Sequence, residues 1–388
     1  MTGQLELLYV DDERTLRDVI SAANGAARYA IDTEFHRERT YFPRLALIQV
    51  QFERVNALID PLAVDPRLLQ PLMESSTLAI LHAAQQDLEV LRYAVGAVPS
   101  TIFDCQLAAG FIGYSTPSLS TLTHSLLRVE LSKGDRMTDW LRRPLTPSQC
   151  EYARSDVFHL ERLYEIIGGE LANRGRLTWV TEACEDLRTK PYGDADPKDV
   201  WLKIREARSL KGRARGVAQA LAEWREKRAM ASNVPVRRIL GDMALVSIAQ
   251  AAPASTEDLA HVRGVDERTM GGSVGREILA AVRDGVHRTV ELPASDGEGI
   301  DKRLRPLVTL ITAWISELAR QHDLDPTLLA TNRDVAGYVS GGASRLSTGW
   351  RRDLIGEDLQ HLMSGRAGLG FTPQGGLALI RTDAASSP

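Results

Sequence analysis

The fold class is decided by the stretch Arg44-Leu45-Ala46-Leu47-Ile48-Gln49-Val50-Gln51-Phe52. This stretch alternates apolar and polar residues at its end, which is typical of a half-buried β-strand. Two shorter apolar runs flank it: Tyr29-Ala30-Ile31, which ends in Asp32, and Ala57-Leu58-Ile59, which is closed by Asp60-Pro61. Three strands joined by short connections predict an antiparallel meander.

Beyond the meander, strand and helix patterns alternate along the chain. Residues 78–81 and 101–103 are short apolar runs that predict strands, and residues 85–94 carry apolar side chains at helical spacing. Residues 118–168 are helical in pattern, with interruptions. The first half of the chain is therefore predicted to be a mixed α/β domain.

Two loop-like segments divide the chain. Residues 189–199 contain two prolines and one glycine, and residues 292–299 contain one proline and two glycines. The segments that follow these loops are helical in pattern. We expect three domains: an α/β domain over residues 1–188 and two all-α domains over residues 200–288 and 300–382.

Composition limits the class of protein. The 388 residues are 44% hydrophobic and 25% charged, as in globular proteins, and no apolar run approaches the ~20 residues of a membrane span. The N-terminal residues do not resemble a secretory signal, and Cys105, Cys150 and Cys184 have no metal-binding spacing. We therefore expect a cytoplasmic protein without a structural zinc site, a membrane contact or an obligate protein partner.

The first candidate for chemistry is Asp32-Thr33-Glu34 at the end of a strand. Residues i and i+2 of a strand point to one face, so the two carboxylates project together. They repel each other unless a cation lies between them, and hard oxygen ligands suit Mg²⁺ or Mn²⁺. Taken alone, such a pair is more often a polar strand end than a metal site.

Two further acidic motifs follow. Asp87 lies early in the predicted helix over residues 85–94, directly after a strand. Tyr152 and Asp156 are four residues apart and share one face of a later helix. Each motif alone is typical of an ordinary helix cap or polar helix face, so only their combination favours a catalytic site.

In this order and spacing the three motifs resemble the DEDD superfamily of 3′→5′ exonucleases, in its tyrosine-bearing branch, and most closely the ribonuclease D family. The segments Phe103 to Ala109 and Thr138 to Leu145 also resemble that family. The position of the catalytic histidine in the other branch is Glu151 here, which supports the tyrosine assignment. The resemblance implies an RNase H-like domain with a mixed five-stranded sheet and flanking helices, followed by two HRDC-type helical domains.

The resemblance also implies a mechanism. Two divalent ions, Mg²⁺ or Mn²⁺, would hydrolyse phosphodiester bonds at an RNA 3′ end and release 5′-mononucleotides. The implied substrates are tRNA precursors and other structured RNAs. The implied metal ligands are Asp32, Glu34, Asp87 and Asp156. Tyr152 would orient the attacking water. Phe35 and His82 are candidate substrate contacts, although a core aromatic and a packing histidine are the simpler interpretations.

The segment over residues 201–240 is strongly basic. It has eleven Lys and Arg residues against three acidic ones, in a chain of net charge −4. It overlaps residues 202–283, which resemble the HRDC module. A local positive surface beside a nuclease site predicts contact with the phosphate backbone, and Lys211, Arg213 and Arg215 are the candidates. The alternative is that these side chains only solvate helix faces.

Two other functions stay open at this point. A DNA 3′→5′ exonuclease would use the same site, because composition does not distinguish RNA from DNA as the substrate. A catalytically inactive RNA-binding scaffold would keep the fold, but such a protein would be expected to lose some of the carboxylates.

Overall fold

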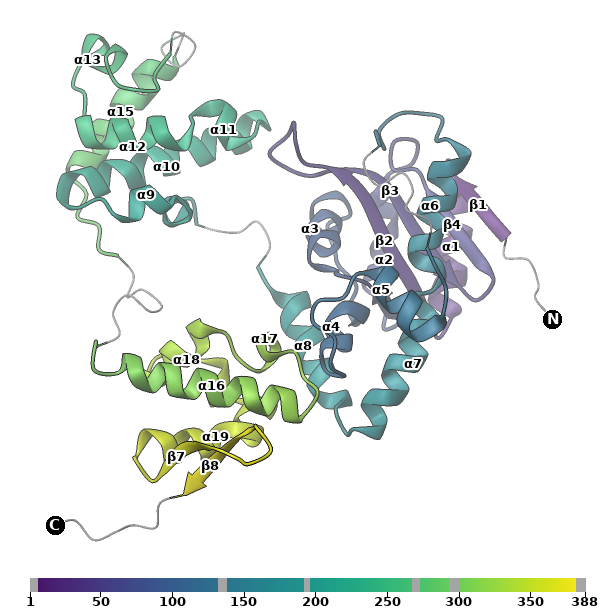
Figure 1. Cartoon of the computed structure of the whole chain (residues 1–388). Coiled ribbons are helices and arrows are strands. Elements are labelled where there is room, and N and C mark those ends of the chain that lie inside the picture. Colours follow the sequence, from purple (N-terminus) through teal and green to yellow (C-terminus); the bar gives the residue numbers. More distant parts are fainter. Residues whose placement is uncertain (1–5, 132–137, 192–195, 267–272, 293–300, 382–388) are drawn as a thin grey trace, which may run out of the picture.

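The computed structural model describes residues 6–131, 138–191, 196–266, 273–292 and 301–381. The described parts form a main body, made of residues before 192 and after 300, and a helical arm, made of residues 200–292 (Figure 1). The predicted linkers over 189–199 and 292–299 lie partly outside the described residues. None of the described helices is long and apolar enough to cross a membrane.

The main body is built on a six-stranded mixed sheet with the strand order β1-β4-β3-β2-β5-β6. Its strands are β1 (Glu6–Val10), β2 (Arg28–His36), β3 (Arg44–Phe52), β4 (Val55–Ile59), β5 (Leu78–Leu81) and β6 (Ile102–Asp104).

The predicted meander is confirmed, since β3 pairs antiparallel with both β2 and β4. Every residue of β3 after Arg44 is buried, because helices cover both faces of the sheet at this strand. The predicted count of five strands was one short. The missed strand, β1, pairs parallel with β4, a partner about fifty residues along the chain that its own short sequence does not indicate.

Two helices matter most for the site. α6 packs on β2, β3 and β4, and α3 packs on β2 and β3. The helices of this part of the main body are α1 (Glu13–Gly25), α2 (Gln70–Met73), α3 (Gln85–Ala94), α4 (Cys105–Gly110), α5 (Leu119–Leu122), α6 (Pro147–Phe158), α7 (Leu160–Asn173) and α8 (Leu177–Thr189).

The helical arm has a hydrophobic core of its own, centred on the buried Trp201. Its two long helices, α10 and α15, cross closely at Gly216 and Gly285, where an added Cβ would collide with the opposite backbone. The helices of the arm are α9 (Arg205–Arg208), α10 (Gly212–Ser232), α11 (Val236–Ile239), α12 (Asp242–Ala251), α13 (Thr256–Ala260) and α15 (Val274–Val286).

The C-terminal region, residues 301–381, shares one hydrophobic core with the α/β part of the main body. The indole of Trp350 stacks on that of Trp179, with ring centroids 4.6 Å apart, and contacts the edge of Phe111. The elements of this region are α16 (Arg305–Gln321), α17 (Pro326–Leu329), α18 (Asn332–Val339), α19 (Gly349–Met363), β7 (Ala367–Phe371) and β8 (Leu377–Arg381).

The end of this region differs from the prediction. An all-α segment was expected up to about Ile380, yet β7 and β8 form an antiparallel hairpin. The apolar run from Leu377 to Ile380 is too short for its periodicity to separate a helix from a strand. The turn before it contains Gly375, whose φ of +86° favours glycine and ends any helix.

Candidate active site

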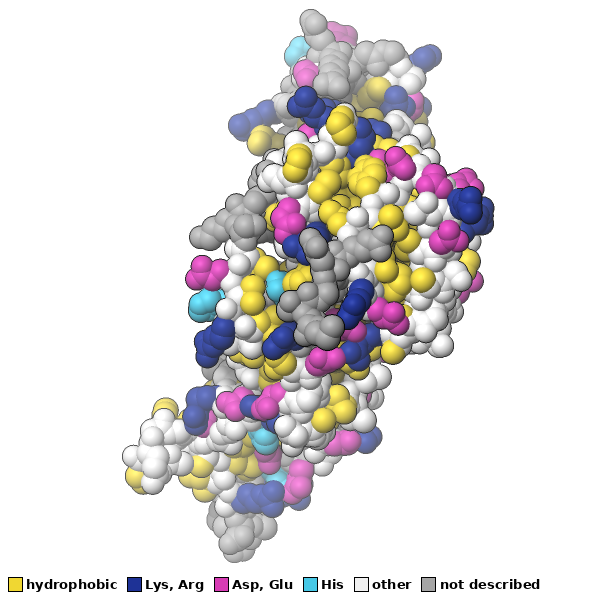
Figure 2. All heavy atoms as spheres, turned by 90° about the vertical axis from the view of Figure 1, so that its right-hand side faces the viewer, with side chains coloured by type: hydrophobic (Ala, Val, Ile, Leu, Met, Phe, Trp, Pro, Cys, Tyr) yellow, Lys and Arg dark blue, Asp and Glu magenta, His cyan; other side chains and the backbone are white. Residues whose placement is uncertain are grey.

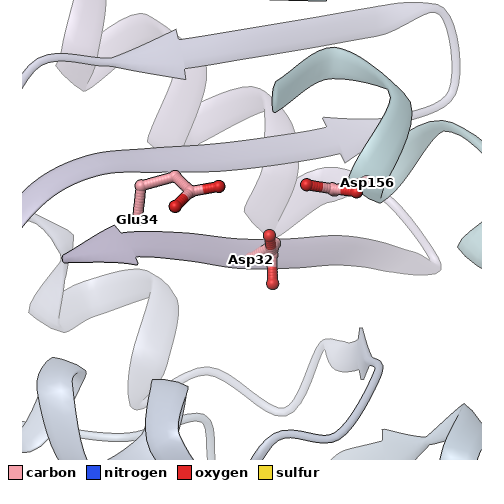
Figure 3. Close-up of side chains that lie close together, drawn as sticks. All are labelled: Asp32, Glu34 and Asp156. Atoms are coloured by element: carbon pink, nitrogen blue, oxygen red, sulfur yellow. The ribbon is translucent and has the colours of Figure 1, made fainter. Parts of the chain in front are cut away.

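The structure brings three of the four predicted carboxylates together. Asp32 and Glu34 lie on the face of β2 that α6 covers, and Asp156 reaches them from α6 (Figure 3). One ligand oxygen from each of the three can be chosen so that all lie within 4.8 Å of one another. Each residue is half-buried, so the cluster is partly shielded from water while still accessible.

The electrostatics of this cluster favour a cation. Burial, and next the nearby charge of Asp156, raise the pKa of Asp32 well above its usual value. The charged form of Asp32 is therefore costly in the bare protein. A divalent cation among these oxygens would offset the repulsion, and an all-carboxylate donor set suits Mg²⁺ or Mn²⁺.

The fourth carboxylate, Asp87, is held by Thr33, the β2 residue between Asp32 and Glu34. The hydroxyl of Thr33 donates to Asp87 Oδ1 at 2.5 Å, and Asp87 is 7% exposed. Burial, and next the charge of Asp32, raise the pKa of Asp87 well above its usual value. Asp87 is thus close enough to Asp32 to interact with it electrostatically, although it lies outside the group of three.

Tyr152 lies on α6 one turn before Asp156. Its ring packs against Trp140, with the ring centroids 5.9 Å apart. The start of α6 is fixed by a capping box, in which the Thr146 hydroxyl accepts from the backbone N–H of Gln149 and the Gln149 side chain accepts from that of Thr146. α6 thereby carries a phenol and a carboxylate on one face.

A salt bridge that the sequence does not indicate anchors the segment before α6. The Arg143 guanidinium donates to Asp60 at 2.5 and 2.7 Å and to the backbone oxygen of Ala46 at 2.7 Å. Burial opposes ionisation of Asp60, but the hydrogen bonds from Arg143 and Tyr9 hold its pKa below the usual value. The two residues are far apart in sequence, and no local pattern could have paired them.

The other predicted contacts near the site lie as follows. Phe35 packs on the main core while staying partly exposed. His82 is half-buried at the turn before α3, and burial lowers its pKa despite the charge of Asp104. Asp104 accepts from four backbone N–H groups, those of Ala83, Ala84, Gln106 and Leu107. Asp104 thus caps α4 and also holds the turn that leads to Asp87.

The predicted basic contacts lie in the arm and differ from one another. Lys211 and Arg213 are exposed at the start of α10. Arg215 instead donates to the backbone oxygens of Leu210 and Val290, at 2.9 and 3.2 Å, and so fastens α10 within the arm. On the face of the molecule in Figure 2, basic and acidic side chains are interspersed. Residues 201–240 carry eleven Lys and Arg residues against three acidic ones.

Comparisons with known proteins now define the family. A 3′-5′ exonuclease family model matches residues 7–172, and an HRDC domain model matches residues 200–282. Ribonuclease D of Granulibacter bethesdensis is 35% identical over 353 residues, covering 88% of this chain and 88% of the relative. Ribonuclease D of Zymomonas mobilis is 33% identical and covers 95% of this chain and 96% of the relative. The chain belongs to the ribonuclease D family.

The solved structures agree with this assignment. The crystal structure of Escherichia coli RNase D is similar to this chain with a TM-score of 0.85 and 27% identity, over 93% of this chain and 99% of that one. The predicted fold class, an α/β exonuclease domain followed by a helical HRDC region, is confirmed. The chain is a 3′→5′ exonuclease hydrolase of the ribonuclease D type. The assignment of residues 300–382 as a second HRDC-type domain stays a prediction.

Proposed function

We propose that the chain removes nucleotides one at a time from the 3′ end of RNA, with two divalent ions, and releases 5′-mononucleotides. The observation that supports this most is the convergence of Asp32, Glu34 and Asp156 within 4.8 Å. Three carboxylates with no basic residue among them form a donor set for Mg²⁺ or Mn²⁺.

Each residue has a role in this proposal. Asp32, Glu34 and Asp156 would hold the metal ions, and Asp87, which accepts a hydrogen bond from Thr33, would complete the acidic site. When bound, the ions would supply charge stabilisation for the attacking and leaving oxygens. Tyr152 orients the attacking water, because an ordinary phenol with a pKa of ~10 is a poor base at neutral pH.

The substrate proposal extends from the relatives. The Escherichia coli RNase D structure is described as that of an exoribonuclease involved in structured RNA processing. We propose that this chain likewise acts on the 3′ ends of structured RNAs, including tRNA precursors. Lys211 and Arg213 in the arm are proposed to contact phosphates, and the exposure of both side chains supports this. Phe35 and His82 are proposed to contact the terminal nucleotides.

The experiment is a digestion of a 5′-labelled RNA with a 3′ overhang, and of the matching DNA, with Mg²⁺ or Mn²⁺ and with an EDTA control. A ladder that shortens from the 3′ end on RNA supports the proposal. Equal digestion of DNA would remove the substrate claim and leave the mechanism. Binding without cleavage of either substrate would favour the scaffold instead.

The matched variants are Asp32→Asn and Glu151→Gln. Asp32→Asn is expected to lower the rate by at least about a thousandfold while RNA binding is kept, because it removes a ligand charge from the site. Glu151 is an exposed carboxylate on α6 that pairs with Arg154 at 2.6 Å, so Glu151→Gln should leave the rate within about twofold. Hydrolysis retained in Asp32→Asn would refute the metal assignment.

A further inference from the structure

Two glutamines of β3 lie under α6. Gln49 is directly opposite Asp32 in the register of β2 and β3, and Gln51 is opposite Ala30. Because residues i and i+2 share a face, both amides lie on the face that carries the carboxylate cluster. Both are buried, with Gln49 at 0% and Gln51 at 5% exposure.

The two amides differ in their hydrogen bonds. Gln51 accepts from the side chain of Asn56 at 3.0 Å and donates weakly to the backbone oxygen of Phe158 in α6 at 3.4 Å. Neither Nε2 nor Oε1 of Gln49 has a hydrogen-bond partner among the described residues. An amide buried in this way costs free energy, and in a native protein it calls for an explanation.

Among the neighbours of Gln49 on this face, Asp32 is the polar residue that stands directly opposite it. Along β3 its neighbours on this face are Leu47 and Gln51, and the Gln51 amide already bonds to Asn56 and to Phe158. Across β4 the neighbour is Leu58. Leu47 and Leu58 are fully buried and belong to a small apolar cluster with Ala153 of α6. Across β2 the neighbour is Asp32. Cβ atoms of directly opposite residues lie about 4.5–5.5 Å apart, which is within the reach of a glutamine amide.

We propose that Gln49 is a positioning residue of the metal site, whose amide N–H donates to the Asp32 carboxylate when the site holds its cations. Carboxylates that ligate metals are commonly hydrogen-bonded by such outer groups, which fix their orientation. This inference rests on the proposed function of the same site. It explains why a fully buried amide lies at this position, beside Leu47 and Leu58.

The test uses the full chain and measures Mn²⁺ binding directly, by calorimetry or by the EPR signal of free Mn²⁺, together with the melting temperature in EDTA. Gln49→Met keeps the volume but removes the amide. We expect its Mn²⁺ affinity to fall about 10–100-fold. Its melting temperature in EDTA should be equal to or above that of the wild type, because an unpartnered amide has been replaced by an apolar group.

The matched control is Gln51→Met on the same strand and face. Its amide has partners, so this variant should melt at a lower temperature while binding Mn²⁺ within about threefold of the wild type. A residue with a merely structural role would behave like Gln51 in both measurements. Gln49→Leu, which cannot overfill the site, is a second variant with the same expected result as Gln49→Met.

The outcomes separate the two proposals. If the wild type binds Mn²⁺ and both Gln49 variants bind it equally well, the positioning role is overturned and the proposed function stands. If the wild type itself does not bind Mn²⁺ or Mg²⁺, the metal mechanism fails, and the inference on Gln49 fails with it.

Discussion

The helical arm and the C-terminal region are both mainly helical, but they are attached to the α/β part of the chain in different ways. The arm buries its apolar residues in its own core. It meets the hairpin between β2 and β3 through polar contacts: Tyr41 donates to Glu226 at 2.6 Å, and the backbone N–H of Phe42 donates to Asn233 at 3.0 Å. The C-terminal region instead continues the core of the α/β part.

This difference indicates which part of the molecule can move. Separating the C-terminal region would expose the stacked indoles of Trp179 and Trp350, and burial of large aromatic side chains is a major source of stability. Separating the arm would mainly exchange a few hydrogen bonds for bonds with water, at a small net cost. The arm is therefore the part expected to adjust to an RNA, while the C-terminal region is part of the framework of the active site.

The largest effect that would test this difference in attachment is expected from a pair of tryptophan substitutions. Trp350 and Trp201 are 4% and 1% exposed, and each anchors one of the two cores. Each Trp→Ala change should lower the free energy of unfolding of its own core by about 3–5 kcal/mol. Trp350→Ala should destabilise the α/β part and the C-terminal region together, whereas Trp201→Ala should destabilise the arm alone.

The measurement is chemical denaturation followed by far-UV circular dichroism, with Mn²⁺-dependent nuclease activity as the signal of the main body. In Trp201→Ala, the denaturant concentration at which activity on a short RNA is lost should be the same as in the wild type, because the main body is not destabilised. A shift of the activity midpoint equal to that of Trp350→Ala would show that the two cores unfold as one unit.

A smaller effect is expected at Arg176, which joins the two parts of the main body. Its guanidinium is buried and donates to the backbone oxygens of Phe111 at 2.6 Å and His322 at 2.7 Å. Arg176→Met leaves both carbonyls without a donor and should cost about 2–3 kcal/mol of unfolding free energy. The measurement is the urea midpoint of the main-body transition.

The matched control for this prediction is Arg174, two residues earlier. It pairs with Asp323 at 3.3 Å but is more exposed, so Arg174→Met should cost less than about 1 kcal/mol. Equal losses in the two variants would contradict the view that the buried bonds hold the C-terminal region in place.

Much of the fold could be predicted because its signals are local. The strand at Leu78–Leu81 and the helix at Gln85–Ala94 were predicted with the observed bounds. The pairing of β1 with β4 and the stacking of Trp179 on Trp350 could not be predicted, because each joins segments far apart in the sequence. Such contacts depend on the tertiary arrangement, which no pattern of spacing contains.

The candidate site also has features that the sequence predicts and features that depend on the tertiary arrangement. The convergence of Asp32, Glu34 and Asp156 was expected from the family motifs, and the structure brings them together. The hydrogen bond that Asp87 accepts from the hydroxyl of Thr33 was not expected. The sequence shows Gln49 only as a polar residue of a strand, and its importance appears once the register places it opposite Asp32.

The smallest expected effect tests the contact of the arm itself. Burial and the bond to Glu226 raise the pKa of Tyr41 above its ordinary value, so the phenol stays a neutral donor through the physiological range. Tyr41→Phe removes this bond and should weaken docking of the arm by about 0.5–1.5 kcal/mol, leaving the stability of each core unchanged. Small-angle X-ray scattering should then show a larger radius of gyration. Tyr9→Phe, which removes a bond to Asp60 inside the main body, should not change the scattering. Identical scattering from Tyr41→Phe and the wild type would mean that this polar contact does not hold the arm.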